Sequence, residues 1–294
     1  MPVTEFQKKV LRLLARNRDP NSFVAGGTVI NRDVDSPRFS RDIDIFHDAE
    51  EAVRISFERD SGLLEVSGFE ISTTINQPSF VRAIITRGAD ELKLDWAVDS
   101  AFRFFPAQKD EEFGYALHPL DLATNKVLAI AGRFEARDFI DVMYFERQGV
   151  SLGLLAWAAA GKDPGLTPDL ILDNCKRFSR MDPEQFRQVL GTSNLNYVHL
   201  RSDWFNMIER AQAVVESLPP AEVGCLYLDQ NGKLVDPISH PEGTLHFGSV
   251  GGAIPRPPGN AGELPKAETR VASEIFIGRY GQSRSENRSR TPQD

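Results

Sequence analysis

The sequence predicts an α+β fold, with a mixed β-sheet carrying helices first and a mainly helical second half after it. Three observations predict this order. Apolar residues occur in short, strand-length runs up to about residue 98, and they recur at helical spacing from residue 119 onward. The chain then becomes rich in Pro, Gly, Ser, Arg and Glu, a composition typical of disordered segments. We therefore expect a sheet-containing core, a helical domain, a β-hairpin segment and a disordered C-terminal tail, at residues 1–118, 119–218, 219–254 and 255–294.

The first 118 residues alternate between helical and strand patterns. Apolar residues at helical spacing predict an amphipathic helix over Glu5–Arg16, and a second helix is expected over Ala49–Arg59. The strand-length runs are Phe23–Ala25, Ile43–Phe46, Leu63–Ile75, Phe80–Thr86 and Glu91–Val98. The last two are joined by Arg87–Asp90, which has the composition of a hairpin turn. Strands interleaved with helices in this way indicate a mixed sheet.

The second half begins at Pro119, a residue favoured in the first turn of a helix. Helical patterns follow over 119–149, 152–160, 168–178, 183–190 and 199–218. Pro219 and Pro220 end this region. Beyond them, apolar runs at 223–228 and 233–235 flank Asn231-Gly232, and an Asn-Gly pair in such a position is a strong hairpin signal.

Composition and charge exclude several classes of protein. The chain of 294 residues has a net charge of −8, so it lacks the strongly basic footprint of a general nucleic-acid-binding protein. A local basic rim that touches one end of an RNA is still compatible with this charge. No apolar run approaches the ~20 residues that span a bilayer, and the N-terminus lacks the apolar segment of a signal peptide. We therefore expect a cytoplasmic protein without a membrane partner.

The segment from Phe23 to Phe46 carries the strongest functional signal. Asp42 and Asp44 are two residues apart in a predicted strand, so their carboxylates project from the same face. They repel each other unless a cation lies between them, and oxygen ligands on a rigid element suit Mg²⁺. Gly26-Gly27-Thr28 precedes a predicted helix start, where free N–H groups favour an anion. Either feature alone is common in sequences without function, but together they indicate a site that handles nucleotides.

A third carboxylate usually completes a site with two metal ions. Asp95 lies inside the apolar strand ELKLDWAVD, where a buried carboxylate needs a partner. A metal ion would supply that partner, and a salt bridge to Lys93 or Lys126 is the alternative. Asp99 is a second candidate, although it lies at the end of the strand.

The helical half contributes a second cluster of charged residues. Lys126 and Arg133 are seven residues apart and so face one side of a helix, as do Asp138 and Asp141, which are three apart. A network of salt bridges between helices would produce the same pattern.

Two segments together resemble the AbiEii/AbiGii toxin family of nucleotidyltransferases, within the polymerase-β-like superfamily. They are Gly26-Gly27-Thr28 with Arg38–Asp44, and the later stretch KVLAIAGRFEARDFIDV. The chain has threonine where the superfamily often has serine, and an unusually long loop separates Thr28 from Asp42. The resemblance implies that residues 1–118 form a nucleotidyltransferase core.

The resemblance also implies roles for individual residues. Metal ions would be held by Asp42, Asp44 and Asp95. Nucleotide would be bound by Gly26, Gly27, Thr28, Arg38, Ser40, Lys126 and Arg133. Catalysis would use Asp42, Asp44, Asp95, Lys126, Asp138 and Asp141, with Asp138 or Asp141 either orienting Lys126 or acting as a base.

The expected activity is Mg²⁺-dependent transfer of a nucleotide from an NTP to an acceptor, with release of pyrophosphate. The resemblance implies the toxin of a toxin–antitoxin or phage-defence pair, with the tRNA 3′ end as a possible acceptor and a cognate antitoxin as a possible partner. Two alternatives stay open at this point. One is a transferase that modifies a small molecule such as an antibiotic, and the other is a nucleotide-binding module without turnover.

Overall fold

The computed structural model describes residues 3–33, 36–191 and 195–255. The described residues belong to one compact unit, Met1–Gly262, while the second unit, Glu263–Asp294, lies outside them. The predicted disordered tail, 255–294, therefore falls outside the described residues except for its first residue. Within this unit the α+β prediction is confirmed.

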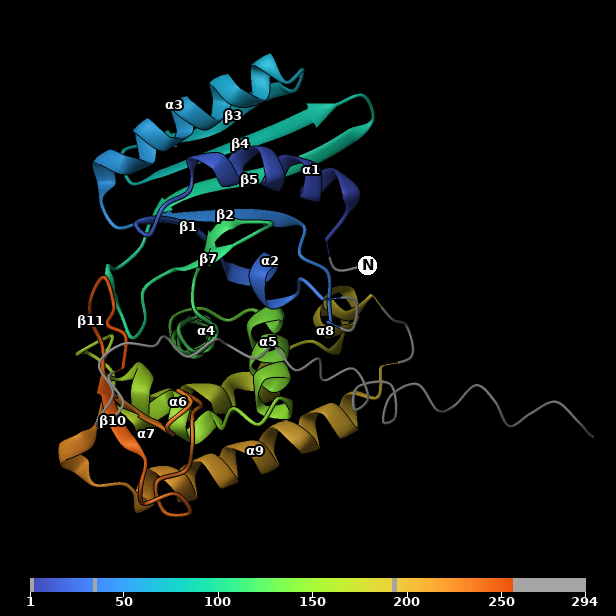
Figure 1. Cartoon of the computed structure of the whole chain (residues 1–294). Coiled ribbons are helices and arrows are strands. Elements are labelled where there is room, and N and C mark those ends of the chain that lie inside the picture. Colours follow the sequence, from blue (N-terminus) through green and yellow to red (C-terminus); the bar gives the residue numbers. More distant parts are fainter. Residues whose placement is uncertain (1–2, 34–35, 192–194, 256–294) are drawn as a thin grey trace, which may run out of the picture. The chain divides into compact units, whose positions relative to one another are not determined.

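A seven-stranded mixed sheet forms the first half, in the order β3-β4-β5-β2-β1-β8-β7. Its strands are β1 (Ser22–Ala25), β2 (Asp42–His47), β3 (Glu70–Gln77), β4 (Phe80–Arg87), β5 (Asp90–Val98), β7 (Gln108–Asp110) and β8 (Gly114–Ala116). The pairs β2–β5 and β1–β8 are parallel, and all other neighbours are antiparallel. Strands β2 and β5 lie side by side at the centre of the sheet, so residues on them meet in register (Figure 1).

The two faces of this sheet differ in character because side chains alternate along each strand. On one face Ile43, Ile45 and Leu94 pack in an apolar cluster beneath α1 (Glu5–Leu14) and α3 (Glu50–Val66). The other face of β2 carries Asp42 and Asp44, so the period of two in the sequence correctly assigns them to one face. Alternation therefore leaves the acidic face of the sheet directed away from α1 and α3.

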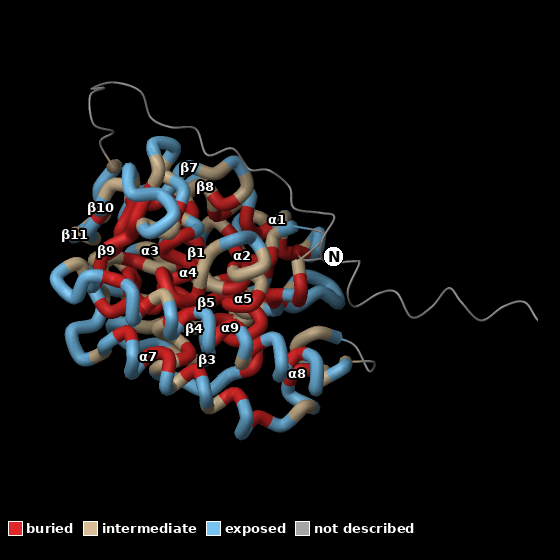
Figure 2. The backbone as a smooth tube through the Cα atoms, turned by 90° about the horizontal axis from the view of Figure 1, so that it is seen from below, coloured by how far each residue is buried: buried red, intermediate tan, exposed pale blue. Residues whose placement is uncertain are grey.

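The second half is helical, as predicted. Its helices are α4 (Pro119–Gly132), α5 (Ala136–Arg147), α6 (Leu152–Ala159), α7 (Pro168–Cys175), α8 (Pro183–Leu190) and α9 (Tyr197–Ser217). A short helix, α2 (Gly26–Ile30), follows β1 and contacts α4. These helices share one large apolar cluster, in which Phe139, Phe178 and Trp204 are fully buried (Figure 2). The cluster includes Phe23 and Ala25 of β1, so the same core packs against the sheet.

The predicted strand over Leu63–Ile75 is wrong in its first part. Helix α3 continues to Val66, beyond the predicted end at Arg59, and β3 starts only at Glu70. Leu64 is fully buried under the sheet and therefore belongs to the apolar stripe of the helix. Ser67 caps the helix, and Gly68 adopts a φ of +79°, which suits glycine because it has no Cβ.

The predicted hairpin at 223–235 forms its turn but pairs differently. Strand β9 (Cys225–Leu228) pairs with β10 (Thr244–Phe247), and the expected partner segment contributes only the isolated bridge Leu228–Leu234. Asp229 holds the turn by accepting from the backbone N–H groups of Asn231 and Lys233. The turn was thus a correct local prediction, but the paired strand comes from further along the chain.

The remaining elements are short. Strand β6 (Phe102–Arg103) pairs with β11 (Ser249–Val250), and 3₁₀ turns occur at Ala15–Asn17, Lys176–Arg180 and Pro220–Glu222. In the part of the chain that the structure describes, no helix has both the length and the apolar character needed to cross a membrane.

Candidate active site

The three predicted metal-binding carboxylates lie on one face of the sheet. Asp44 of β2 is the register partner of Asp95 of β5, and Asp42 precedes Asp44 by two residues on the same face. The parallel pairing of these strands therefore brings together carboxylates that are 51 residues apart in the chain.

Cations on the neighbouring strands neutralise two of these carboxylates. Lys93, the register partner of Asp42, places its Nζ 2.8 Å from the Asp42 Oδ2. Arg82 of β4 donates two hydrogen bonds of 2.7 Å to Asp95. Burial raises the pKa of Asp42, but the hydrogen bond from Lys93 and the charges of Lys93 and Arg137 outweigh it and lower that pKa.

Asp44 lies between these ion pairs without one of its own. Among the described residues, no side chain forms an ion pair or hydrogen bond with its carboxylate. Burial, and then the charges of Asp42 and Asp95, raise the pKa of Asp44 to about 6, although Lys126 and Arg137 lower it in part. The centre of the acidic face is therefore a carboxylate whose negative charge is poorly compensated.

The glycine pair lies directly against this carboxylate. Gly26 has a φ of +70°, and a Cβ built on it would collide with the Asp44 carboxylate. A Cβ on Gly27 would collide with the guanidinium of Arg38. Gly26 therefore requires glycine because of its positive φ, whatever it binds, and a larger residue at Gly27 would have to displace the Arg38 guanidinium.

Thr28 and Ser40 form the connection between α2 and β2. The buried Thr28 hydroxyl donates to the backbone carbonyl of Asp42, and it also lies 3.1 Å from the Ser40 hydroxyl. Gln7 of α1 donates to the Ser40 carbonyl at 2.9 Å, so this loop is also tied to the first helix. Both hydroxyls are thus engaged inside the protein, where they fix the start of the acidic strand.

The second predicted cluster is a buried ion-pair network centred on Lys126. Its Nζ lies 2.8 Å from Asp138 and 2.9 Å from Asp141, so the two helices α4 and α5 are joined through one ammonium group. Arg133 donates two hydrogen bonds to Asp138. Arg38 donates two bonds of 2.6 Å to Asp141, which links the loop before β2 to α5.

These contacts set the charge states of the network. Burial raises the pKa of Asp138, but hydrogen bonds from Arg133 and the charge of Lys126 outweigh it and lower that pKa to about 2. Burial likewise raises the pKa of Asp141, and the charge of Lys126 with the bonds from Arg38 outweighs it, so this pKa is also lowered. Carboxylates held this firmly in the ionised form are suited to orienting Lys126 rather than to accepting a proton.

The structure therefore brings all the predicted site residues into two neighbouring groups. The acidic group on the sheet and the Lys126 network lie within electrostatic range, since Lys126 lowers the pKa of Asp44 and Asp44 raises the pKa of Arg133. Sequence reasoning missed Arg82 and the pairing of Arg38 with Asp141. Arg82 did leave a signal, because it is the only charged residue in the apolar run Phe80–Thr86.

The donor chemistry of the acidic group suits a hard cation. Carboxylate oxygens on rigid strands, one of them without a positive partner, are the ligands that Mg²⁺ prefers. As the side chains stand, no group of three or more His, Cys, Asp or Glu residues in the described ranges is arranged to hold a metal. Asp42 and Asp95 are instead turned to Lys93 and Arg82, so metal binding would have to open these ion pairs.

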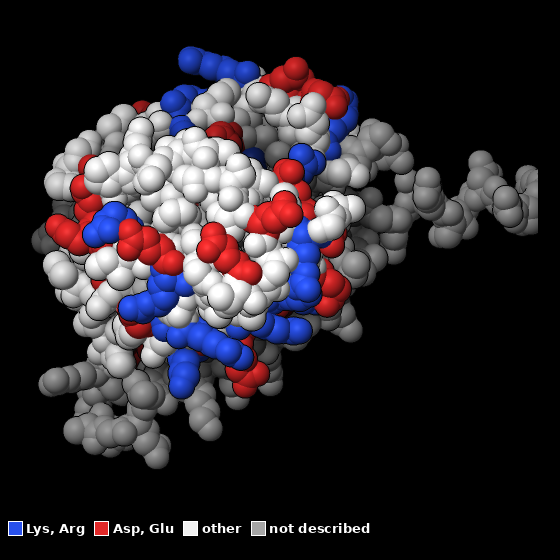
Figure 3. Space-filling view, turned by 90° about the horizontal axis from the view of Figure 1, so that it is seen from above, with Lys and Arg blue, Asp and Glu red and all other residues white. Residues whose placement is uncertain are grey.

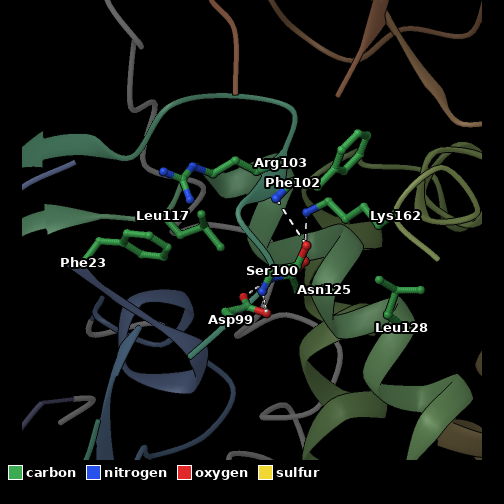
Figure 4. A pocket seen from close by; sticks show the side chains of 9 residues that line it. All are labelled: Phe23, Asp99, Ser100, Phe102, Arg103, Leu117, Asn125, Leu128 and Lys162. Atoms are coloured by element: carbon green, nitrogen blue, oxygen red, sulfur yellow. Dashed lines mark hydrogen bonds between the residues drawn. The ribbon is translucent and has the colours of Figure 1, made fainter. Parts of the chain in front are cut away.

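A small pocket is lined by none of these residues. It has a volume of about 70 Å³ and is lined by Asp99, Arg103, Asn125 and Lys162 together with apolar neighbours (Figure 4). The buried Lys162 ammonium binds Asp121 at 2.7 Å and Asn125 at 2.8 Å. Asp99, the alternative third carboxylate, thus belongs to this cavity rather than to the acidic face.

The structure thus presents a mixed sheet with clustered carboxylates beside a glycine turn, and a buried lysine and arginines lie alongside. A family model described as the nucleotidyl transferase AbiEii toxin of type IV toxin–antitoxin systems matches residues 12–221. The chain belongs to this family of nucleotidyltransferase toxins. The predicted resemblance is thereby confirmed.

Three solved structures are similar to this chain at low sequence identity. MenT4, a nucleotidyltransferase toxin from Mycobacterium tuberculosis, shares the fold; it is 17% identical with a TM-score of 0.53, covering 74% of this chain and 83% of its own. JHP933 from Helicobacter pylori is 18% identical with a TM-score of 0.45, covering 73% of this chain and 95% of its own. Another protein of Helicobacter pylori, described as a nucleotidyltransferase, is 17% identical with a TM-score of 0.45, covering 72% and 96%. A comparison with curated proteins found no significant match to this chain.

Proposed function

We propose that this protein transfers a nucleotidyl group from an NTP to the 3′-hydroxyl of an RNA, with tRNA as the expected acceptor, in a Mg²⁺-dependent reaction. The observation that carries the proposal is the Asp44 carboxylate, which lies between Asp42 and Asp95 without an ion pair among the described residues. A carboxylate held in this way favours binding of a divalent cation, because the cation removes the repulsion among the three groups.

In this mechanism Asp42, Asp44 and Asp95 would hold Mg²⁺ on the acidic face. The ion would supply positive charge that stabilises the negative charge of the reacting groups. Asp95 accepts the proton of the acceptor hydroxyl as its oxygen forms a bond to the α-phosphorus. The bond from that phosphorus to the bridging oxygen breaks, and pyrophosphate leaves with the electron pair.

The remaining predicted residues position the nucleotide. Gly26 and Gly27 let the Asp44 carboxylate and the Arg38 guanidinium lie directly against the backbone, which places both groups beside the bound nucleotide. Lys126, fixed by Asp138 and Asp141, contributes positive charge toward the transferring group, and Arg133 reinforces it. Arg38, Ser40 and Thr28 act in this scheme mainly by holding the strand start in place, since their polar groups are bonded within the protein.

Membership of a toxin family supports a cellular role as the toxin of a pair, with an antitoxin as its partner. In that role the modified RNA would lose its normal function, and the antitoxin would prevent the damage.

The experiment that tests the proposal incubates purified protein with Mg²⁺, total RNA and each of the four α-labelled NTPs. We expect label at RNA 3′ ends with one or two of the nucleotides, together with pyrophosphate, and no label with D44N. Label in small molecules but not in RNA would favour the alternative transferase. Tight NTP binding without pyrophosphate release would overturn the proposal in favour of a non-catalytic module.

A further inference from the structure

The surface that carries α1 holds a groove that the site described above does not use. This open groove, of about 570 Å³, is lined by Glu5, Lys9, Arg12, Leu13, Arg16, Ser67 and Arg87. Four positive side chains face one negative one, so its formal charge is +3 on a chain whose net charge is −8. Lys and Arg also gather along one rim of the molecule seen from above (Figure 3). The groove is thus a local reversal of the overall charge.

Helical periodicity explains how the sequence builds this groove. Lys9, Arg12 and Arg16 are spaced by three and four residues, so they lie on one face of the helical segment. The opposite face, with Val10, Leu11 and Leu14, is buried under the sheet. From Lys9 to Arg16 the row extends about 10 Å, at roughly 1.5 Å per residue.

The positive side chains of the groove form no ion pairs within the described part of the chain, although the charge of Arg12 acts on the nearby Glu5 carboxylate. Lys9, Arg12, Arg16 and Arg87 are all exposed, and none forms an ion pair with any residue that the structure describes. Glu5, the one acidic member, is instead bound by Lys8 at 2.9 Å. Unpaired cations in a row leave an attractive field for an anionic partner.

Phe69 holds two of these cations close together. The Lys9 ammonium lies 5.8 Å from the centre of its ring, and the Arg87 guanidinium lies 5.1 Å from it. Both are attracted to the ring but repel each other, and an anionic oxygen between them would remove that repulsion. The groove is therefore arranged to receive anionic groups.

The groove lies across the sheet from the acidic face, on the side that α1 covers, and the start of β2 connects the two sides. Gln7 in the first turns of α1 donates to the Ser40 carbonyl, and the Ser40 hydroxyl lies 3.2 Å from the Asp42 carbonyl. At its other end, α1 continues into the 3₁₀ turn Ala15–Asn17, and the chain then enters β1 at Ser22. Ser22 pairs with His47, the last residue of β2. Helix α1, and with it the row of cations, therefore follows the sheet from the end where β2 begins toward the end where β2 finishes, on the side opposite the carboxylates.

We propose that the α1 groove binds the phosphate backbone of the RNA acceptor, whose 3′ end passes around the start of β2 to reach Asp42, Asp44 and Asp95 on the other face of the sheet. A strand of RNA presents one phosphate per nucleotide, which suits a linear row of exposed Lys and Arg side chains. Arginine also binds phosphate oxygens through two parallel hydrogen bonds. An acidic protein partner fits less well, since a stable protein interface needs buried apolar anchors and Leu13 is the only apolar residue of the groove.

The proposal rests on the proposed function for the identity of the acceptor, but its test measures binding alone. The probe is a fluorescein-labelled RNA hairpin with a single-stranded 3′ end, titrated with full-length protein in the absence of NTP. The variant R12E/R16E reverses two groove charges. The matched control R180E/R201E reverses two exposed arginines of the helical half and changes the net charge by the same amount.

We expect R12E/R16E to weaken RNA binding about tenfold or more at moderate salt, and the control to bind within about twofold of the wild type. The slope of log affinity against log salt should fall by about one for each RNA phosphate that the variant no longer binds. Unchanged affinity and slope in R12E/R16E, or equal weakening in both variants, would overturn the proposal. Circular dichroism and the melting temperature verify folding, and R12Q/R16Q replaces the variant if the charge reversal unfolds α1.

The outcomes separate this inference from the proposed function. Loss of RNA binding in R12E/R16E, in a protein that transfers no nucleotide, would support the groove and refute the transfer reaction. If the wild type transfers nucleotides to RNA and R12E/R16E binds RNA normally, the transfer reaction is supported and the role of the groove is refuted.

Discussion

At the scale of single residues, the Asp44 carboxylate lowers the free energy of unfolding and also belongs to the acidic face. Its pKa is raised to about 6 because it is buried and lies beside Asp42 and Asp95. A raised carboxyl pKa means that the folded state binds the proton more tightly than the unfolded state does. Stability therefore falls as the pH rises from about 4 to about 6, by roughly 3 kcal/mol for a shift of this size.

We predict that D44N will be more stable than the wild type above pH 6 without divalent ions, by up to roughly 3 kcal/mol. The difference should shrink toward pH 4, where Asp44 is protonated in the wild type. Urea unfolding at a series of pH values measures this. The exposed carboxylate of Asp169 provides the control, and D169N should show no such dependence on pH.

The same variant provides a test of metal binding that does not depend on activity. We expect Mg²⁺ to raise the melting temperature of the wild type near pH 7.5, because a bound cation relieves the repulsion at Asp44. D44N should show little or no such rise. An equal rise in both proteins would place the Mg²⁺ effect outside the acidic face.

At the scale of elements, the site is assembled by ion pairs that join segments distant in sequence. Asp141 of α5 receives Arg38 from the loop before β2 and Lys126 from α4, so one carboxylate fixes three segments. Asn31, at the end of α2, adds a bond of 3.1 Å to the same carboxylate. Since the Asp141 side chain is fully buried, these partners must all be present for the carboxylate to be tolerated.

We predict that D141N will destabilise the protein by roughly 3–5 kcal/mol, because it leaves the buried Arg38 guanidinium without its carboxylate. The matched control is E58Q, which breaks an exposed pair with Arg54 on α3 and should cost at most about 1 kcal/mol. Chemical unfolding of both variants measures the difference. Similar destabilisation in the two would mean that the network contributes no more than a surface salt bridge.

At the scale of the whole molecule, the buried His47 and the half-buried His118 contribute to the response to acid. Burial, and then the charge of Arg18, lower the pKa of His47 to about 4, and burial lowers that of His118 to about 4. Both stay neutral in the folded protein at a pH where the unfolded chain binds protons. Stability should therefore fall as the pH drops from about 6.5 to about 4, by roughly 3 kcal/mol for each histidine.

We predict a net loss of stability between pH 6.5 and pH 4, because two histidines outweigh the opposite contribution of Asp44. A second loss follows below about pH 4, as Asp138, whose pKa is lowered to about 2, becomes protonated. Unfolding free energies at pH 7, 5 and 3 measure both phases. H118Q should lose less stability between pH 6.5 and pH 4 than the wild type does. An unchanged pH profile in H118Q would show that His118 does not cause this loss.

Much of the fold was predictable because local periodicity determines it. The period of two in β2 assigned Asp42 and Asp44 to one face, and the helical spacing after Pro119 identified the second half. The start of β3 was misplaced because a short apolar run such as Leu63–Val66 suits a helix end and a strand equally well. Only packing under the sheet decides between them.

The sequence by itself determined which residues could form the site, since the carboxylates, the glycine pair and Lys126 follow from residue type and local spacing. The tertiary structure alone decided their partners: Arg82 for Asp95, Arg38 for Asp141 across 103 residues, and β10 for β9. The physical reason is that a repeat pattern records only which face a side chain occupies. Which charges then meet depends on strand order and helix packing, which arise from contacts between segments far apart in the chain.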